Sequence, residues 1–507
     1  METVLNIFRI IWVIFLVLMT FNVLILVHEW GHFLAARWRG LQVDRFQIWF
    51  GKPLWKKTVN GVQYGLGSIP AGGFVALPQM APMEAIEGKN VNEDEEGEEP
   101  RDLPPITPLD KVIVAFAGPL FSFLLAVVFA VAVSFVGKPV SEAGSTTIIG
   151  GIDPSYPAAK SDLKVGDKIL SVDGNKVSRF LGMIDSIQWN IASGTSNPIV
   201  LEVERPGDGV KTIEIDMPTN EEKAAKEKKK AWWKLLVDRP SLRRIGIAPR
   251  TTPIIKELAD PGPGMEAGLM PGDIVAKVNG KEMTSLAGVW VYETEHLGEP
   301  LNYSIIRGED KQKLEVTVVP RLPLEPSEAK KEPHTGILWD GVGVHGIVYP
   351  GIFEQVSDSL MMMKNTLGAI VTPKSEVSVS HLSGPVGIMG LYFDLFSMSN
   401  GWRFVLWFSV IMNVNLAVLN LLPFPVLDGG HIVMASFEWI RRKPMKFRVL
   451  EMVQTAFVIL LLGFMVFVTM KDVGDRVKST VNGGKGKELR FGPKESVPGV
   501  QPSSEKK

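Results

Sequence analysis

Residues 10–32 read IIWVIFLVLMTFNVLILVHEWGH, an apolar run that ends in two histidines. The apolar part is interrupted only by Thr20 and Asn22. Crossing a hydrocarbon core about 30 Å thick takes about 20 helical residues. The run therefore predicts a membrane-spanning helix. A cleaved signal peptide is the alternative, but no small-x-small cleavage site follows the run.

Three later runs are also long enough to span a membrane. The mean hydropathy of the 507-residue chain is +0.14, as expected if spanning helices alternate with soluble parts. Buried helices of a soluble protein are the alternative, but such helices rarely stay apolar on every face. The three runs are Val112–Val136, Phe404–Leu422 and Val449–Met470.

The composition excludes several classes of protein. Lys plus Arg is 54 and Asp plus Glu is 55, a net charge of −1, which excludes a generally basic nucleic-acid binder. A hydrophobic content of 46% excludes a wholly disordered chain. The chain has no cysteine, so disulfides, thiolate metal sites and cysteine nucleophiles are excluded. Any metal ion must be bound by nitrogen and oxygen ligands.

Basic residues predict the orientation of the spans. The loop between the third and fourth runs is the most basic short loop, and such loops are usually cytoplasmic. The end of the first run that carries the two histidines then also lies on the cytoplasmic side, and residues 137–403 lie outside. The basic residues of this loop are Arg441, Arg442, Lys443, Lys446 and Arg448.

The outside block contains an internal repeat. The sequence LKVGDKILSVDG at 163–174 recurs as LMPGDIVAKVNG at 269–280. Each copy contains a Gly-Asp turn, an apolar-rich strand and a hairpin-type turn. Both copies resemble PDZ domains, over 145–217 and 245–320. That resemblance implies binding of extended peptides along a sheet edge; two β-rich spacers without a ligand are the alternative.

The end of the first run reads His28-Glu29-Trp30-Gly31-His32. Positions i and i+4 share one face of a helix, so both imidazoles can reach a single metal ion. Zinc suits two histidines plus an oxygen ligand. Glu29 can hold and deprotonate a metal-bound water. Two satisfied histidines in a chance match are the alternative interpretation.

Two histidines leave a zinc site short of a third protein ligand. Asp428 closes the third run in the sequence NLLPFPVLDGGH at 420–431, at the same predicted membrane depth as His28. Pro423 and Pro425 break the helix there. We therefore expect Asp428 to complete the site; His431 is the alternative ligand in the same compartment.

These paired motifs resemble the site-2 protease family of intramembrane metalloproteases. The layout of four spans with two PDZ-like domains outside resembles a bacterial branch of that family. The resemblance implies zinc on His28, His32 and Asp428, with Glu29 as the general base. It also implies that Asn415 and Asn420, on the third span, take part in substrate handling.

Other matches to the family concern a loop and the second span. Tyr64-Gly65-Leu66-Gly67 through Phe74 resembles a membrane-associated β-hairpin that can pair with an unwound substrate, which makes Gly65 and Gly67 candidate substrate-binding residues. A plain surface loop is the alternative. Gly118-Pro119 resembles a motif of the second span whose usual asparagine is replaced by Ser122, and no role is assigned to that serine.

The predicted fold is a polytopic α-helical membrane protein with four transmembrane helices, a membrane-associated β-hairpin and two extracytoplasmic PDZ-like β-rich domains. An apolar stripe at Val356, Leu360 and Met363 predicts an amphipathic helix on the outer membrane surface, or one packed on a domain. Residues 84–99 predict a solvated acidic linker. The predicted segments are 1–34 (first span with zinc motif), 35–110 (cytoplasmic-side hairpin and linker), 111–137 (second span), 145–217 and 245–320 (PDZ-like domains), 350–400 (amphipathic helix region), 402–430 (third span), 448–470 (fourth span) and 471–507 (disordered tail).

The expected function is that of a zinc metalloendopeptidase of a bacterial inner membrane. Its substrates would be single-span membrane proteins, such as a trimmed anti-sigma factor or signal-peptide remnants. The expected partners are these substrates, peptide C-termini at the PDZ-like domains and the lipid bilayer, with no nucleic acid. The alternative is a non-catalytic PDZ-containing receptor or chaperone with a structural zinc site, against which the intact Glu29 argues.

Overall fold

The computed structural model describes residues 2–80, 106–218, 238–308, 310–324, 332–398, 400–442, 447–487 and 491. The chain divides into two compact units, which are described separately below. The acidic stretch 84–99 and residues 492–507 of the predicted tail lie outside the described residues. The first unit is Met1–Pro139, Ile347–Leu367 and Leu382–Val473, and the second is Val140–Gly346, Gly368–His381 and Gly474–Lys507.

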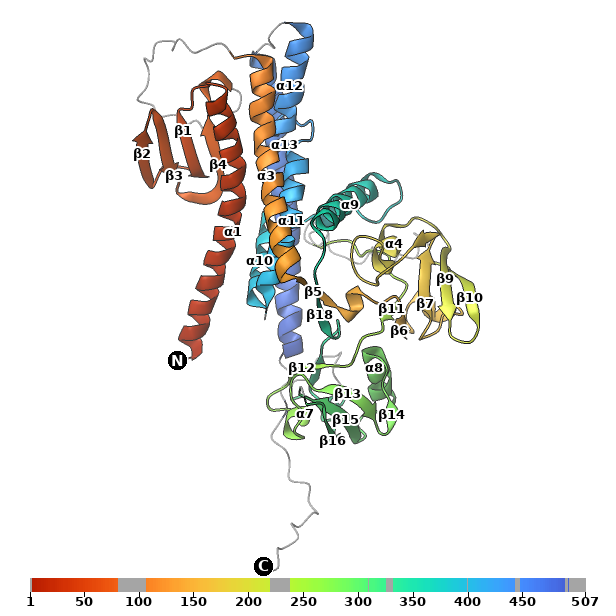
Figure 1. Cartoon of the computed structure of the whole chain (residues 1–507). Coiled ribbons are helices and arrows are strands. Elements are labelled where there is room, and N and C mark those ends of the chain that lie inside the picture. Colours follow the sequence, from red (N-terminus) through yellow and green to blue (C-terminus); the bar gives the residue numbers. More distant parts are fainter. Residues whose placement is uncertain are drawn as a thin grey trace, which may run out of the picture. The chain divides into compact units, whose positions relative to one another are not determined.

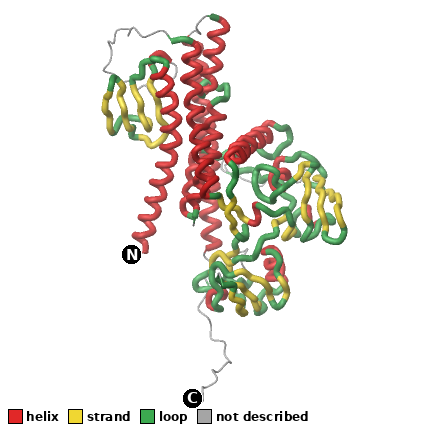
Figure 2. The backbone as a smooth tube through the Cα atoms, in the orientation of Figure 1, coloured by secondary structure: helices red, strands yellow, loops and turns green. Residues whose placement is uncertain are grey.

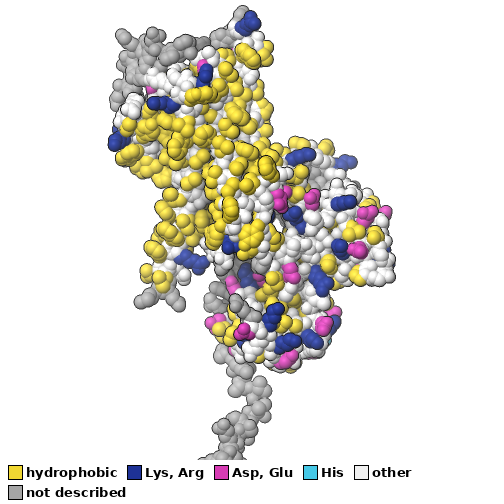
Figure 3. Space-filling model, in the orientation of Figure 1, with side chains coloured by type: hydrophobic (Ala, Val, Ile, Leu, Met, Phe, Trp, Pro, Cys, Tyr) yellow, Lys and Arg dark blue, Asp and Glu magenta, His cyan; other side chains and the backbone are white. Residues whose placement is uncertain are grey.

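The described residues include four helices long and apolar enough to cross a membrane (Figure 1). The prediction of four spanning helices is thus confirmed. Hydrophobic side chains cover much of the helical surface, as expected where helices contact lipid (Figure 3). The helices are α1 (Glu2–Trp38), α3 (Pro108–Val136), α11 (Gly401–Asn420) and α13 (Phe447–Lys487).

Helix α3 is the central helix of the first unit, because it packs against α1, α11 and α12 (Asp428–Arg441). Its start is fixed by a capping box. The Thr107 hydroxyl accepts a hydrogen bond from the Asp110 N–H (3.2 Å), and the Asp110 carboxylate accepts one from the Thr107 N–H (3.0 Å). This cap fixes the residue at which α3 begins.

The predicted hairpin region forms a four-stranded sheet in the order β2-β3-β1-β4, seen beside α1 in Figure 2. Strands β1 and β3 pair in parallel, and the other pairs are antiparallel. One face packs against α1 and α3 through a cluster that includes Ala36, Val75 and Val114. The strands are β1 (Arg45–Phe50), β2 (Trp55–Val59), β3 (Val62–Leu66) and β4 (Ile69–Ala76).

The fourth span continues beyond Met470, where the sequence predicted its end. The side chain of Asp472 is buried and accepts hydrogen bonds from the N–H groups of Gly384 (2.9 Å) and Gly387 (2.8 Å). These donors lie at the start of α10 (Pro385–Ser397), so the carboxylate caps that helix. A polar residue that is satisfied in this way allows α13 to continue, and the first part of the predicted disordered tail is helical.

Helix α9 (Ile352–Val371) covers the predicted apolar stripe, but its buried face is partly polar. Gln355 and Ser359 are buried together with Met363, whereas Leu360 is 42% exposed. The Gln355 amide donates to the carbonyl of Ala130 on α3 (2.9 Å). A hydrogen bond to a neighbouring helix therefore turns the helix away from the orientation that the apolar stripe alone predicts.

Two β-rich domains of the same strand arrangement lie in the second unit. The first domain has the sheet order β10-β9-β7-β8 and the second the order β14-β13-β15-β16, which is the same topology. The predicted β-rich character of this block is confirmed. The first domain's elements are β6 (Ile149–Ile152), β7 (Lys168–Val172), β8 (Asn175–Lys176), α4 (Ile187–Ser193), β9 (Ile199–Arg205), β10 (Gly209–Ile215) and β11 (Ile247–Pro249).

The second domain repeats this plan, and its short helix α7 corresponds to the 3-10 helix Pro157–Lys160 of the first domain. Its strand β17, which follows the sheet, pairs with β12 in the same way as β11 pairs with β6 in the first domain. The elements are β12 (Ile255–Leu258), α7 (Pro263–Glu266), β13 (Ile274–Val278), β14 (Lys281–Glu282), α8 (Leu286–Glu295), β15 (Leu301–Arg307), β16 (Gln312–Val318) and β17 (Ile337–Trp339). Strands β5 (Lys138–Ser141) and β18 (His345–Val348) lie at boundaries of the two units.

Each domain is completed by a strand that comes late in the sequence. Ile245 is buried in the core of the first domain, and Ile247 packs against the same core. The sequence placed both residues in the second domain, because the repeat alone does not show that a strand returns across the linker.

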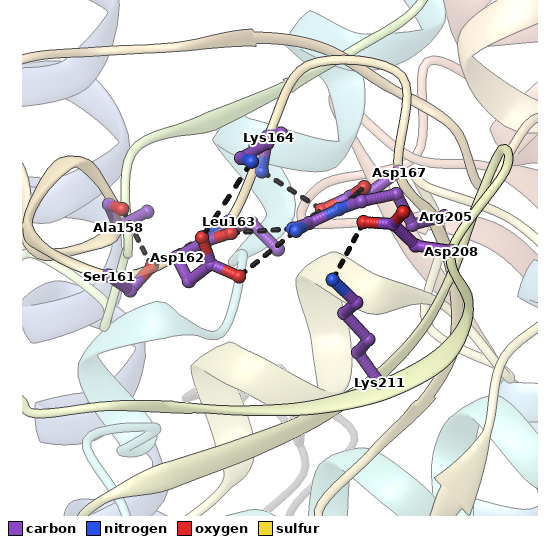
Figure 4. A network of polar contacts seen from close by, with 9 residues as sticks. All are labelled: Ala158, Ser161, Asp162, Leu163, Lys164, Asp167, Arg205, Asp208 and Lys211. Carbon is purple, nitrogen blue, oxygen red and sulfur yellow. Dashed lines mark hydrogen bonds and ion pairs between the residues drawn. The ribbon is translucent and has the colours of Figure 1, made fainter.

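The repeated Gly-Asp turn is anchored by a buried ion pair in each domain. Asp167 accepts two hydrogen bonds from the guanidinium of Arg205 (both 2.8 Å), as Figure 4 shows. Asp273 accepts two from Arg307 (both 2.7 Å) at the matching place. Although burial alone would raise it, the hydrogen bonds from Arg205 hold the pKa of the Asp167 carboxyl below its usual value. The repeated Gly-Asp sequence therefore serves to hold the same turn in both domains.

Candidate metal centre

His28 and His32 lie one turn apart on α1, and both side chains are buried. Their Nε2 atoms are 3.2 Å apart, with the rings edge to face. Because the i and i+4 positions share one face of a helix, both nitrogens point to the same place. The motif predicted from the sequence is thus assembled as expected from helical geometry.

Asp428 is the first residue of α12, and its carboxylate faces both imidazoles. Oδ2 lies 3.3 Å from His28 Nε2, and Oδ1 lies 3.4 Å from His32 Nε2. The ligand atoms of the three residues lie within 4.8 Å of one another, and all three residues are buried. The structure therefore brings together residues that are 396 positions apart in the chain (428 − 32).

Glycines allow the backbone before Asp428 to pack against the start of α12. A Cβ on Gly429 would lie 2.2 Å from the Leu421 carbonyl oxygen, and one on Gly430 would lie 2.1 Å from the Phe424 carbonyl oxygen. Real Cβ atoms do not approach backbone oxygens so closely. The Asp-Gly-Gly sequence is therefore required by space, and it turns the carboxylate towards α1.

The donor set and its spacing fit a tetrahedral zinc ion. Zinc binds histidine nitrogens and carboxylate oxygens at about 2.0–2.2 Å, so ligand atoms of a tetrahedral site lie about 3.3–3.5 Å apart. The two Nε2 atoms are 3.2 Å apart, which is close to that value, and each has a different oxygen of the Asp428 carboxylate nearby, Oδ2 at 3.3 Å from His28 and Oδ1 at 3.4 Å from His32. Three protein ligands leave one position for water or substrate, as in catalytic rather than structural zinc sites.

The remaining predicted residues divide into those near the centre and those away from it. The Nδ2 atom of Asn420 lies 3.4 Å from His28 Nε2. Asn415 is five positions earlier on α11, and its buried Oδ1 has no hydrogen-bond partner among the described residues. His431 is buried one turn after Asp428 but does not belong to the three-residue cluster. The geometry therefore favours Asp428 over His431 as a ligand.

Gly65 and Gly67 do not lie next to the histidines. Gly65 is on β3, which is separated from the edge strand β4 by β1, and Gly67 follows β3. A Cβ on Gly67 would lie 2.4 Å from the Phe50 carbonyl oxygen, so its role is close packing within the sheet. The strand that approaches Glu29 is β4: a Cβ on Gly73 would lie 3.2 Å from Glu29 Cγ.

Three small residues that the sequence did not single out for a role bring α1 and α3 together. A Cβ on Gly31 would lie 2.4 Å from the Ala117 carbonyl oxygen, and one on Gly118 would lie 2.1 Å from His32 Nε2. Ser122, one turn after Gly118, is fully buried and contacts His28. The signal in the sequence is the spacing of four between Gly118 and Ser122, which places both on one face of α3.

The chain is similar to known proteins over most of its length. Residues 15–464 match the model of Peptidase family M50. The protein named Protease RseP of Yersinia pestis is 28% identical over 481 residues, covering 90% of this chain and 98% of that protein. Regulator of sigma E protease of Salmonella typhi is 27% identical over 90% of this chain and 98% of its own length. A protein of Neisseria meningitidis named as a putative zinc metalloprotease is 28% identical over 85% of this chain and 92% of its own.

Proposed function

Because the chain belongs to peptidase family M50, we propose that this zinc metalloprotease of a membrane uses His28, His32 and Asp428 as its zinc ligands. The observation that carries the proposal is the convergence of these three buried side chains, whose ligand atoms lie within 4.8 Å of one another. They come from α1 and α12, two elements that no local motif connects. The resident metal is zinc, in keeping with the zinc metalloprotease names of relatives.

Zinc bound there supplies a Lewis acid next to the scissile carbonyl. The chain's own residues do the rest of the chemistry. Glu29 follows the first ligand on α1 and acts as the general base that accepts a proton from the attacking water and delivers it to the leaving nitrogen. The Asn420 amide, beside His28, donates a hydrogen bond to the substrate carbonyl oxygen.

The proposed substrates are single-span membrane proteins that are cleaved within or near the bilayer. A helical substrate must unwind before its carbonyl can be attacked, and unwound backbone in a membrane needs hydrogen-bond partners. Strand β4 is an edge of its sheet, and it passes Glu29 at Gly73. It is the element that supports strand addition by an extended substrate, a role that was predicted for Gly65 and Gly67.

The biological setting is also proposed. Relatives that are named as regulators of sigma E support a substrate of the anti-sigma class in a bacterial inner membrane. The β-rich domains would then face the periplasm as PDZ domains. A cavity of about 950 Å³ is lined by β11 and α4 of the first domain and by α8 of the second, and it is of a size to take an extended peptide.

The test is Glu29→Gln in the full-length protein, with Glu257→Gln on an exposed strand as the matched control. We expect Glu29→Gln to abolish cleavage of a transmembrane substrate while zinc stays near one per chain by mass spectrometry. The control should retain both. Full activity of Glu29→Gln would exclude Glu29 as the general base. A wild-type protein that binds zinc but cleaves no transmembrane substrate would favour the alternative, a non-catalytic receptor with a structural zinc site.

A further inference from the structure

The two imidazoles of the centre are oriented by different kinds of group. In His32 the Nδ1 atom lies 2.8 Å from the backbone carbonyl oxygen of Val114. In His28 the Nδ1 atom lies 2.9 Å from the hydroxyl oxygen of Ser122. Both partners belong to α3. The Val114 carbonyl belongs to the backbone, so a side-chain substitution does not remove it, whereas the Ser122 hydroxyl is removed by substitution.

The direction of the hydrogen bond to Ser122 decides whether His28 can bind a metal. The Nε2 atom of His28 faces Asp428 and His32, so it needs a free lone pair, and the ring proton must be on Nδ1. Nδ1–H then donates to the Ser122 oxygen. If the hydroxyl instead donated to Nδ1, the proton would be on Nε2 and would block the ligand position.

Ser122 lies where water cannot replace it as the hydrogen-bond acceptor of His28. Ser122 has no exposed surface, and His28 is only 8% exposed. A donor that is buried away from water and loses its acceptor is costly, because no solvent molecule replaces the lost hydrogen bond. The spacing of four from Val114 to Gly118 to Ser122 puts all three residues on one face of α3, with the glycine allowing the close approach.

We propose that Ser122 is a positioning residue of the zinc centre, which accepts the Nδ1 proton of His28 and so presents the Nε2 lone pair to the metal. The proposal rests on the zinc ligands assigned under the proposed function. Ser122 does not touch substrate or metal. Groups of this kind fix the tautomer and orientation of a ligating histidine, and their loss commonly lowers metal affinity or activity about 10- to 100-fold.

The experiment compares Ser122→Thr with Ser122→Val in the full-length protein in lipid nanodiscs. The two side chains have nearly the same volume and differ by the hydroxyl group, so the pair separates hydrogen bonding from packing. Zinc affinity is measured by competition with a chelator, and the visible spectrum of the cobalt-substituted protein reports ligand geometry. We expect zinc binding by the valine variant to be at least about tenfold weaker than by the threonine variant, with an altered cobalt spectrum.

Ser122→Ala tests the same contact without added volume, and Ser134→Ala is its matched control. Ser134 is on the same helix, and its hydroxyl donates to the Val131 carbonyl (2.8 Å) within α3. We expect Ser122→Ala to weaken zinc binding about tenfold or more and Ser134→Ala to leave it unchanged. Wild-type zinc affinity in Ser122→Ala, or equal affinity in the threonine and valine variants, would overturn the proposal.

Asp428→Ala distinguishes this proposal from the one on which it rests. If Asp428→Ala binds zinc like the wild type, the ligand assignment itself fails. If Asp428→Ala loses zinc while Ser122→Ala and Ser122→Val keep wild-type affinity and spectrum, the ligand assignment holds and only the role of Ser122 is wrong.

Discussion

Asp167 in the first β-rich domain and Asp428 in the helical unit are both buried aspartates beside a glycine, but they face different partners. Asp167 is 1% exposed and binds the guanidinium of Arg205 with both carboxylate oxygens. Asp428 is 7% exposed and faces the nitrogens of two imidazoles. A buried carboxylate that a guanidinium already satisfies stabilises a turn. One that faces only groups able to ligate a metal indicates a metal centre.

The glycines beside the two aspartates differ as well. Gly166 has a positive φ of +97° and open space where a Cβ would be. Gly429 is helical, and its Cβ would collide with the backbone carbonyl of Leu421. The first glycine is required by conformation and the second by space. The glycine of Gly166-Asp167 and that of Asp428-Gly429 are thus under different physical constraints.

The largest effect is expected from removing the carboxylate of the metal centre. Asp428→Ala should lose zinc and reduce proteolysis below detection, because two imidazoles alone leave a weak and mobile site. Zinc content by mass spectrometry and cleavage of a transmembrane substrate are the readouts. His431→Ala, which changes a buried neighbour on the same helix, should retain zinc. The opposite pattern would make His431 the ligand.

Replacing Gly429 by alanine should give the second largest effect. Gly429→Ala must displace the α11–α12 backbone and so move Asp428, and we expect zinc affinity to fall at least about tenfold. Gly166→Ala should cost roughly 1–2 kcal/mol of local stability, since only the left-handed conformation is strained, and should leave zinc affinity unchanged. Chelator competition on both variants checks this. Equal zinc affinities would remove the distinction drawn between the two glycines.

Breaking the ion pair of the first domain should have a moderate and local effect. In Asp167→Ala the buried guanidinium of Arg205 loses its main acceptor, and an unsatisfied buried group costs about 1–3 kcal/mol. Amide hydrogens of β7 and β9 should therefore exchange roughly 5- to 100-fold faster, as measured by mass spectrometry of the full-length protein. Exchange near the second domain's Asp273 serves as the internal control. Unchanged exchange in β7 and β9 would show that the pair contributes nothing.

The smallest effect is a pH dependence of the same pair. The pKa of Asp167 in the folded domain is lowered, so its contribution to stability is complete above the unfolded-state value of about 3.9. That contribution is lost as the pH falls through the lower folded-state pKa. The stability advantage of wild type over Asp167→Asn, measured by hydrogen exchange, should be constant above about pH 5 and shrink below about pH 4. A constant advantage down to pH 2 would contradict this assignment.

The apolar helices and the pairing of His28 with His32 were predictable because their signals are local or specific. The four apolar runs indicate helices by length alone, and His28 and His32 are joined by helical periodicity. Asp428 was predicted less directly, from its position at the end of the third span and from the family resemblance, since nothing in the residues around it measures its distance from α1. Whether Asp428 or His431 faces the histidines of α1 depends on tertiary packing, which the local sequence does not reveal.

The residues that sequence analysis missed act through contacts between distant segments. Ser122 contacts His28 across 94 positions, a pairing that no periodicity contains. The strand next to Glu29 is β4 rather than the segment with Gly65 and Gly67, because the sheet order inserts β1 between them. Likewise, Ile245 belongs to the first β-rich core because a strand returns after the linker, which the repeat does not reveal.

The separation of the ligands along the chain has a consequence for biosynthesis. His28 and His32 enter the membrane early, whereas Asp428 is synthesised 396 residues later (428 − 32). At about 5–20 residues per second, this interval lasts roughly 20–80 s. The nascent chain therefore carries an incomplete metal site while its β-rich domains fold. Under the proposed ligand assignment, proteolytic capacity arises only after Asp428 has been translated, and a chain that ends earlier would be inert.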